Sequence, residues 1–181
     1  MFAYLTATAV QPFTVKRGRR MTLAATLLAC AAGSAQARET VSFNPAVEPG
    51  TIVVRTSHRR LYLVLEKGTA VAYRVAVGRS GKQWFGRAVV DGKHLNPAWI
   101  PPADVRKDNP KLPDVIPGGA PNNPMGAAAL TLSGDKYAIH GTNQPRSIGT
   151  AASYGCIRMR NEDVTDLFGR VSVGATVVVE R

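Results

Sequence analysis

Short runs of β-branched and aromatic residues, separated by turn-forming residues, are the feature that most constrains the fold of this chain. The runs Thr51–Arg55, Leu61–Leu65 and Val71–Val77 are separated by Ser57-His58-Arg59 and Glu66-Lys67-Gly68. This pattern predicts a meander of short antiparallel strands. Three segments nearer the C-terminus extend it.

Two of these segments, Leu130–Leu132 and Tyr137–His140, flank the turn-forming Ser133-Gly134-Asp135. They predict a hairpin whose second strand ends at the histidine. The third segment, Thr176–Val179, predicts a final strand. The sequence therefore favours a mainly β domain.

One helix is predicted near the C-terminus, beginning with Asn161 as its N-terminal cap and ended by Gly169. Glu162 and Asp163 would be the acidic residues of its first turn, and its apolar face would consist of Val164, Leu167 and Phe168. A long proline-rich segment, 91–126, shows no periodicity and reads as irregular. Loops of this length are uncommon in compact domains unless they act as binding loops or lids.

The first 37 residues have the pattern of an export signal. Basic residues at positions 16–20 precede an apolar run, Met21–Ala32, and the small-residue triplet Ala35-Gln36-Ala37, which is the pattern of a secretory signal peptide. A spanning helix needs about 20 apolar residues, more than this run holds. We therefore expect a signal peptide at 1–37, a lead-in arm at 38–50, a domain at 51–181 and a periplasmic location.

Two other export routes stay open. Leu27-Leu28-Ala29-Cys30 is similar to a lipoprotein processing site, which would leave the protein lipid-anchored to a membrane through Cys30, and Arg19-Arg20 permits a twin-arginine signal. With or without the anchor, the domain leaves the cytoplasm. Cleavage after residue 37 leaves Cys156 as the only cysteine, in a compartment that oxidises spare thiols. A cysteine kept there needs a chemical reason.

The charge balance favours anionic partners. The whole chain has a formal net charge of +11, and four of its 23 Lys and Arg residues but no acidic residue lie in the first 37, so the exported part carries +7. Acidic lipid and the bacterial wall polymer suit such a surface. Basic residues without interleaved aromatic residues, together with export, disfavour nucleic acid. The alternative is that the charge serves solubility alone.

Cys156 and His140 suit acyl transfer. A thiol attacks a carbonyl as the thiolate, and an imidazole can take the thiol proton and return it to a leaving amine. The backbone N–H groups of Tyr154, Gly155 and Cys156 are candidates for binding the oxyanion, and Gly155 permits a tight turn there. The three histidines and the cysteine lack metal-ligand spacing, and no Gly-rich phosphate loop precedes a helix. We expect no metal and no cofactor.

Two long motifs carry a family resemblance. They are His140-Gly141-Thr142-Asn143-x-Pro145-x-Ser147-Ile148-Gly149 and Ser153-x-Gly155-Cys156-Ile157-Arg158-Met159-x-Asn161-x-Asp163-Val164. Together they resemble the active-site signature of the L,D-transpeptidase catalytic (YkuD) domain, the type found in ErfK, YbiS, YcfS and YnhG. Asn123-Pro124-Met125-Gly126 and Pro97-x-Trp99 extend the resemblance, which covers about residues 51–180.

The chain departs from the family pattern at two places. Gln83-Trp84-Phe85-Gly86 stands where many members have Thr-Pro-x-Gly, and Tyr154 stands where many carry a second histidine before the Gly-Cys. The resemblance implies a single YkuD-like β-sandwich or barrel-like domain of mixed sheets, with one or two short helices and the long proline-rich loop.

The resemblance also implies site roles. Cys156 would be the nucleophile, His140 the general base and acid, and the Gly141 carbonyl would orient the imidazole. Arg158, Ser153, Asn143 and Trp99 are expected to contact substrate. For Ser153, hydrogen bonding within the cysteine loop is the competing interpretation, and for Trp99 packing in the core.

The implied reaction is L,D-transpeptidation of peptidoglycan. A tetrapeptide stem would lose its terminal D-alanine to form a Cys156 thioester, and an amine of a neighbouring stem would take the acyl group in a 3→3 cross-link. The alternatives are lipoprotein anchoring, D-amino-acid exchange or hydrolysis through the same thioester, and an inactive wall-binding module. We expect a monomer whose partners are stem peptides and, in the anchoring alternative, a lipoprotein.

Overall fold

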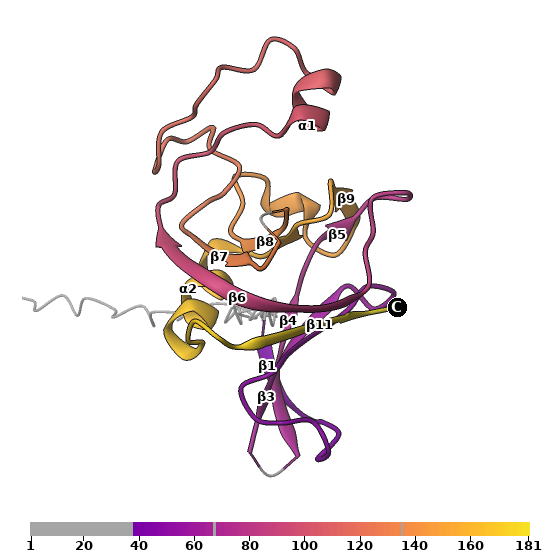
Figure 1. The fold of residues 1–181 in the computed structure, drawn as a ribbon. Helices are drawn as coiled ribbons and strands as arrows, with labels where there is room; N and C mark the ends of the chain where they lie inside the picture. Colours follow the sequence, from indigo (N-terminus) through magenta and orange to yellow (C-terminus); the bar gives the residue numbers. More distant parts are fainter. Residues whose placement is uncertain (1–37, 67, 135) are drawn as a thin grey trace, which may run out of the picture. The chain divides into compact units, whose positions relative to one another are not determined.

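A computed structural model describes residues 38–66, 68–134 and 136–181, so the predicted signal peptide and Cys30 lie outside the described residues. Within this part of the chain, nine strands form one curled, mixed sheet in the order β1-β4-β3-β2-β11-β6-β7-β8-β10, and β5 pairs with β9 in a separate small sheet (Figure 1). The predicted mainly β fold is confirmed.

The predicted meander is antiparallel, as expected, and is formed by β2 (Ile52–Arg55), β3 (Arg60–Leu65) and β4 (Thr69–Arg74). The third strand ends earlier than its residue pattern suggests, because the chain leaves the sheet after Arg74 and pairs again as β5 (Val77–Gly78). The last strand, β11 (Thr176–Glu180), lies parallel to β2 and closes the meander onto the rest of the sheet.

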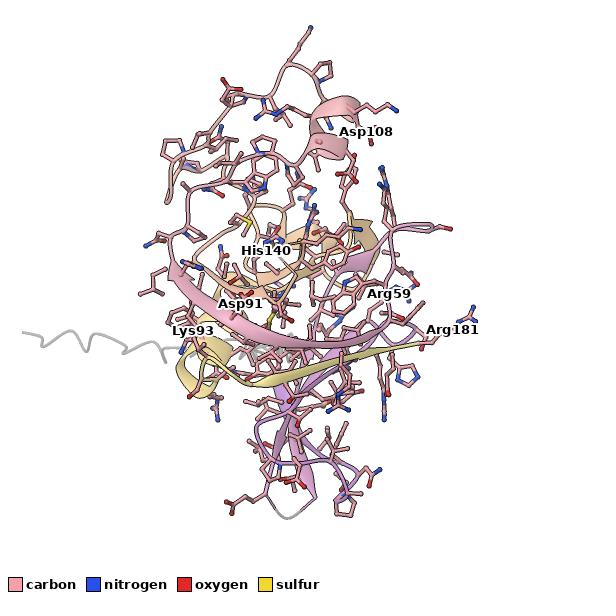
Figure 2. The ribbon with its side chains drawn as sticks, in the orientation of Figure 1. Arg59, Asp91, Lys93, Asp108, His140 and Arg181 are labelled. Carbon is pink, nitrogen blue, oxygen red and sulfur yellow. The ribbon has the colours of Figure 1, made fainter. Side chains whose placement is uncertain are left out.

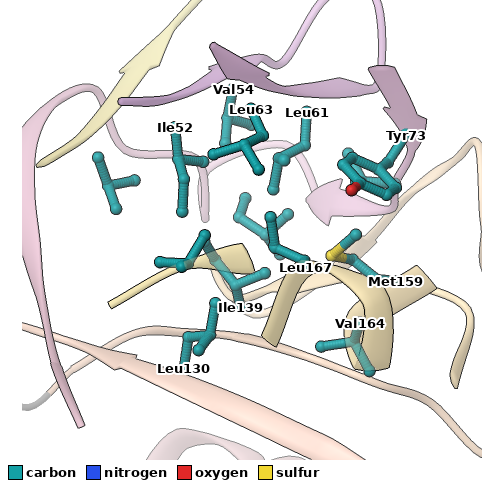
Figure 3. Close-up of a cluster of buried hydrophobic side chains, with 14 of the residues drawn as sticks. Ile52, Val54, Leu61, Leu63, Tyr73, Leu130, Ile139, Met159, Val164 and Leu167 are labelled. Atoms are coloured by element: carbon teal, nitrogen blue, oxygen red, sulfur yellow. The ribbon is translucent and has the colours of Figure 1, made fainter. Parts of the chain in front are cut away.

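The core lies between the curled sheet and the helix α2 (Asn161–Arg170), as Figure 3 shows. Ile52 and Leu61 from the meander meet Leu130 and Ile139 from the hairpin, and Leu167 enters from the helix. Each of these five side chains is fully buried. Burying an aliphatic side chain of this size stabilises a fold by about 1.5–3 kcal/mol, so this cluster fixes the hairpin that carries His140.

The hairpin strands are β7 (Ala128–Leu132) and β8 (Ala138–His140), which pair antiparallel as predicted. After β8 come a short 3-10 turn, η1 (Pro145–Ser147), then β9 (Ala151–Ser153) and β10 (Ile157–Arg158). β10 lies parallel to β8 at the sheet edge. This return path brings the cysteine back beside the histidine.

Besides the short strands β9 and β10, the sequence pattern missed two longer strands. The expected lead-in arm begins with β1 (Arg38–Ser42), which pairs with β4, and the segment expected to be irregular from residue 91 begins inside β6 (Gly86–Leu95). β1 is an exposed edge strand with few apolar residues, while β6 contains glycines and a register shift between Val90 and Gly92. Both rely on backbone pairing more than on an apolar face.

Residues 96–127, which connect β6 to β7, form what we call the cap segment. It contains the short helix α1 (Ala103–Asp108), and Trp99 pairs with Ile116 across it. Figure 1 shows the cap segment at the top of the view, on the side of the domain where β8 and β9 lie. Among the described residues, no helix is long and apolar enough to cross a membrane.

The helix α2 forms where the sequence predicts one, but its ends differ. Arg160 occupies the N-cap position without a side-chain cap hydrogen bond, and the helix continues through Gly169 to Arg170. The prediction that Asn161 caps the helix is wrong. Its Oδ1 accepts hydrogen bonds from Thr142 N at 3.0 Å and Ala127 N at 3.2 Å, so it fastens the two loops that flank β7 and β8.

Candidate active site

His140 and Cys156 come together because β8 and β10 are parallel neighbours. His140, the last residue of β8, pairs with Arg158 of β10, and Cys156 immediately precedes that strand. Met159 N donates to His140 O at 2.8 Å and continues the pairing. A histidine and a cysteine separated by a long loop are thus held by sheet hydrogen bonds.

The His140 ring is buried and fixed in orientation. Its Nδ1 lies 2.7 Å from the carbonyl oxygen of Gly141, and a carbonyl can only accept, so Nδ1 carries the hydrogen in the neutral ring. The pKa of His140 is lowered from 6.5 to about 4, chiefly by burial and secondly by the charge of Arg158, while hydrogen bonds with the backbone of Gly141 and Pro124 act in the opposite sense. At neutral pH the ring is uncharged, and Nε2 can accept a proton.

Cys156 is a half-buried free thiol. Burial raises its pKa, whereas a backbone hydrogen bond with Ala138 and the positive charge of Arg158 lower it. The resting pair is therefore a neutral thiol and a neutral imidazole. In such a pair the thiol proton moves to the imidazole as the sulfur attacks, and a thiolate does not have to be stored beforehand.

We call residues 153–156 the cysteine loop. Ser153 is buried, its Oγ accepts a hydrogen bond from Gly155 N at 3.0 Å, and it donates to the carbonyl of Cys156. Gly155 has a φ of +122°, and a Cβ there would strike the Tyr137 ring. The loop is therefore built around a glycine, and Ser153 contributes to its shape through its hydroxyl.

These hydrogen bonds determine which of the three predicted oxyanion donors already have an acceptor. The N–H of Gly155 already donates to Ser153 Oγ. The N–H groups of Tyr154 and Cys156 are consequently the better candidates for a developing oxyanion.

The sulfur and the imidazole line one cavity of about 310 Å³. The expected substrate-contacting residues Arg158, Ser153, Asn143 and Trp99 line it as well. The cap segment supplies much of the opposite wall, through Trp99, Pro102, Val105, Asn109, Leu112, Ile116, Asn122, Pro124 and Met125. The cavity combines a largely apolar wall with the Cys156 thiol, the His140 imidazole and the cationic Arg158.

Polar contacts tie the cap segment to the cysteine loop. Asp108 of α1 accepts a hydrogen bond from the Tyr154 hydroxyl and from Arg79 at 2.8 Å, and Arg79 also lies 4.0 Å from the centre of the Tyr154 ring. Lys82 donates to Asp104 at 2.7 Å. In Figure 2 Asp108 lies on α1, on the side of the cap segment that faces the region of His140. Tyr154 thus acts as an attachment point for the cap.

The contacts of two side chains near the site were not predicted from the sequence. Trp84 donates from Nε1 to Gly155 O at 3.0 Å, so it contacts the cysteine loop directly. Asn123 is buried at the base of the cap segment, and its Nδ2 donates to Pro97 O and Pro117 O, both at 2.9 Å. The Asn-Pro-x-Gly motif was the available signal for Asn123, whereas nothing in the residue pattern placed Trp84.

The remaining histidines lie elsewhere. His58 is exposed in the β2–β3 turn, and His94 is exposed on β6 rather than in a loop. In the part of the chain that the structure describes, no group of three or more His, Cys, Asp or Glu side chains could hold a metal ion.

The fold and this site define a mainly β domain with a cysteine and a histidine in one cavity, and comparison with known proteins gives its family. Residues 49–179 match the L,D-transpeptidase catalytic domain, YkuD. The chain belongs to the L,D-transpeptidase catalytic domain family. It is 40% identical over 136 residues to the probable L,D-transpeptidase YbiS of Escherichia coli K12, a match that covers 70% of this chain and 43% of YbiS. The chain thus spans less than half the length of that relative.

Solved structures agree with the fold. L,D-transpeptidase 3 from Mycobacterium tuberculosis aligns over 72% of this chain and 60% of its own, with a TM-score of 0.57 and 14% identity, which supports the fold alone. A Brucella melitensis protein described as a probable carnitine operon oxidoreductase is 42% identical, covers 79% of this chain and 92% of its own, and has a TM-score of 0.53. Neither α-helix in the described part of the chain follows a Gly-rich nucleotide loop, because α1 follows Pro101-Pro102 and α2 follows Met159-Arg160.

Proposed function

We propose that this chain is an exported cysteine L,D-transpeptidase that acts on peptidoglycan stem peptides. The observation that carries the proposal is the pairing of β8 with β10, which places His140 and Cys156 in one cavity with Nδ1 of the histidine held on the Gly141 carbonyl. That arrangement provides a nucleophile and a base whose free nitrogen can exchange a proton. It is the minimum that two-step acyl transfer needs.

In the first step Cys156 Sγ attacks the carbonyl of the L,D peptide bond of a tetrapeptide stem, and His140 Nε2 takes the thiol proton. The carbonyl oxygen becomes an oxyanion, which the backbone N–H groups of Cys156 and Tyr154 would bind. The C–N bond then breaks, and the proton on His140 passes to the amine of the departing D-alanine. The product is a thioester on Cys156.

In the second step an amine of a neighbouring stem attacks the thioester, and His140 removes a proton from that amine. The C–S bond breaks, the thiol regains its proton, and a 3→3 peptide cross-link is formed. The cationic Arg158 on the cavity wall suits a carboxylate of the acidic stem, and the apolar cap wall limits the entry of water, which would otherwise hydrolyse the thioester.

Incubation of the purified protein with defined tetrapeptide muropeptides tests this proposal. We expect free D-alanine and 3→3 dimers by mass spectrometry, and neither product from Cys156→Ala. Tripeptides without dimers would indicate hydrolysis, and a muropeptide–lipoprotein conjugate formed in place of dimers when a lipoprotein is supplied would indicate anchoring. If wild-type protein binds the muropeptides without releasing D-alanine, the chain is a wall-binding module and the proposal is wrong.

Export forms part of the proposal. Arg38, which would follow the predicted cleavage site, is the first residue of β1. The N-terminal peptide of protein recovered from cells should therefore begin at Arg38 and appear in the periplasmic fraction. A lipidated Cys30 in the membrane fraction would support the alternative anchor, and full-length cytoplasmic protein would contradict export.

A further inference from the structure

Trp84 contacts the cysteine loop from outside the cavity. Its Nε1 donates to the carbonyl oxygen of Gly155 at 3.0 Å. Its ring stacks on Tyr137, with 5.0 Å between the ring centres and an angle of 1° between the ring planes. Because Tyr137 in turn lies against Gly155, the two aromatic rings and the glycine form one packed layer.

The hydrogen bond fixes a peptide plane that matters for chemistry. The carbonyl of Gly155 and the N–H of Cys156 belong to the same peptide unit, and the described residues contain no cis peptide bond. In a trans peptide unit the C=O and N–H bonds point in opposite directions. Holding Gly155 O on Trp84 therefore directs the Cys156 N–H away from Trp84.

Other contacts engage the neighbouring peptide units of the loop. Gly155 N–H is already bonded to Ser153 Oγ at 3.0 Å, and the carbonyl of Cys156 accepts from the same hydroxyl. The peptide units on both sides of the Gly155–Cys156 unit are thus held by Ser153. The central unit depends on Trp84.

We propose that Trp84 is a positioning residue that aims the backbone N–H of Cys156 at the oxyanion formed during acylation. This inference rests on the proposed function of Cys156. Trp84 lies within Gln83-Trp84-Phe85-Gly86, where the chain departs from the family pattern, so the role arises from this chain's own residues. Without the indole N–H, the peptide unit is free to rotate about a glycine, and the oxyanion loses a preorganised donor.

The test compares two reactions of the same sulfur. Imipenem acylates through a tetrahedral oxyanion: the Sγ–C bond forms, the lactam C–N bond breaks, and the thiol proton ends on the lactam nitrogen. Iodoacetamide alkylates Sγ by displacing iodide, without any oxyanion. A residue that only packs the loop would affect both reactions, whereas a residue that aims the N–H affects acylation alone.

The variants are Trp84→Phe, which keeps an aromatic ring on Tyr137 but removes the N–H, and Phe85→Leu, a control at the exposed neighbouring position. For Trp84→Phe we expect the limiting rate of acylation to fall about 10- to 100-fold. The imipenem concentration that gives half of the limiting rate, and the rate of alkylation by iodoacetamide, should both stay within about twofold of the wild-type values. Phe85→Leu should match wild type in every measurement. Where Trp84→Phe folds poorly, benzothienylalanine introduced site-specifically at position 84 alone replaces only the N–H by sulfur.

The outcomes separate the two proposals. If wild type is acylated and both Trp84 replacements are acylated equally fast, Trp84 does not aim the donor. Equal losses in acylation and alkylation would show a loosened loop and would also overturn the inference. If wild type is alkylated by iodoacetamide but never acylated by imipenem, the acyl-transfer function itself fails, and the role of Trp84 fails with it.

Discussion

His140 and Arg158 occupy paired positions on the parallel strands β8 and β10, so a guanidinium lies beside both the imidazole and the thiol of the site. Arg158 is half-buried, and its Nε has no hydrogen-bond partner among the described residues. The charge of Arg158 lowers the pKa of His140 and that of Cys156. This strand register therefore places one cation beside both side chains and in the wall of the cavity that they line.

Arg158→Gln should move the acid limb of acylation to higher pH. The imidazole acts as a base only when neutral, and removing the nearby cation raises the pKa of His140, so the rate should begin to fall at a higher pH than the wild-type limb near pH 4. Imipenem acylation rates measured across pH give the limb, and Arg146→Gln, at an exposed position on η1, is the control. An unchanged limb in Arg158→Gln would show that the guanidinium does not act on the imidazole.

Burial of neutral His140 should make the fold sensitive to acid. The pKa of His140 is depressed from 6.5 to about 4 in the folded protein, so the unfolded chain binds the proton first as pH falls. Its contribution to stability is present above pH 6.5 and is lost as pH falls through about 4.

His140→Gln removes this titration. Urea unfolding at about pH 7 and about pH 4.5 should show a smaller loss of unfolding free energy in the variant than in wild type, with acidic side chains contributing equally to both. Equal losses would mean that the folded protein does not keep the ring neutral.

The contact of Asp108 with Tyr154 and Arg79 should hold the cap segment against the body. Asp108→Asn weakens this contact, so we expect faster amide hydrogen exchange in α1 than in wild type. Added salt screens exposed charge pairs, so it should speed the exchange of α1 in wild type more than in the variant, which has already lost the charge of Asp108. Asp114→Asn is the matched control, since Asp114 pairs with Arg106 inside the cap. Unchanged exchange in Asp108→Asn would show that the cap is held by its apolar contacts alone.

Asn161 should stabilise the loops around β7 and β8 through its side-chain oxygen. Asn161→Ala leaves the N–H groups of Thr142 and Ala127 without that acceptor and should cost about 1–3 kcal/mol of unfolding free energy. Asn161→Asp keeps an acceptor and should retain most of the stability. Chemical unfolding measures both, and equal losses in the two variants would point to a role other than accepting these bonds.

The strands of the meander and of the hairpin, and the closeness of His140 to Cys156, were predictable because local sequence patterns determine them. Runs such as Leu61–Leu65 consist mainly of apolar residues that a strand can bury in the core. The long motif around Cys156 is specific enough to carry a family resemblance. The edge strand β1 gave no such signal, because Val41 is its only aliphatic residue and backbone pairing with β4 holds it.

The contacts of Asn161 and Trp84 escaped prediction for another reason. Asn161 stands where helix caps commonly stand, but its oxygen serves loops far away in the sequence. Trp84 bonds Gly155 across 71 residues. Neither residue type indicates a hydrogen-bond partner so far away in the sequence, so only the folded structure shows which groups these side chains contact.

Intact-mass measurement of the protein after exposure to imipenem tests the central claim, acyl transfer at Cys156, most directly. We expect one added drug mass, located on Cys156 by peptide mapping, formed much more slowly in His140→Ala and absent from Cys156→Ala. Losses of less than about tenfold in His140→Ala would be too small for a general base. If a generic alkylating reagent labels Cys156 in the native protein while no imipenem adduct forms, or if neither reagent reacts until the protein unfolds, Cys156 is not the nucleophile of an acyl-transfer site.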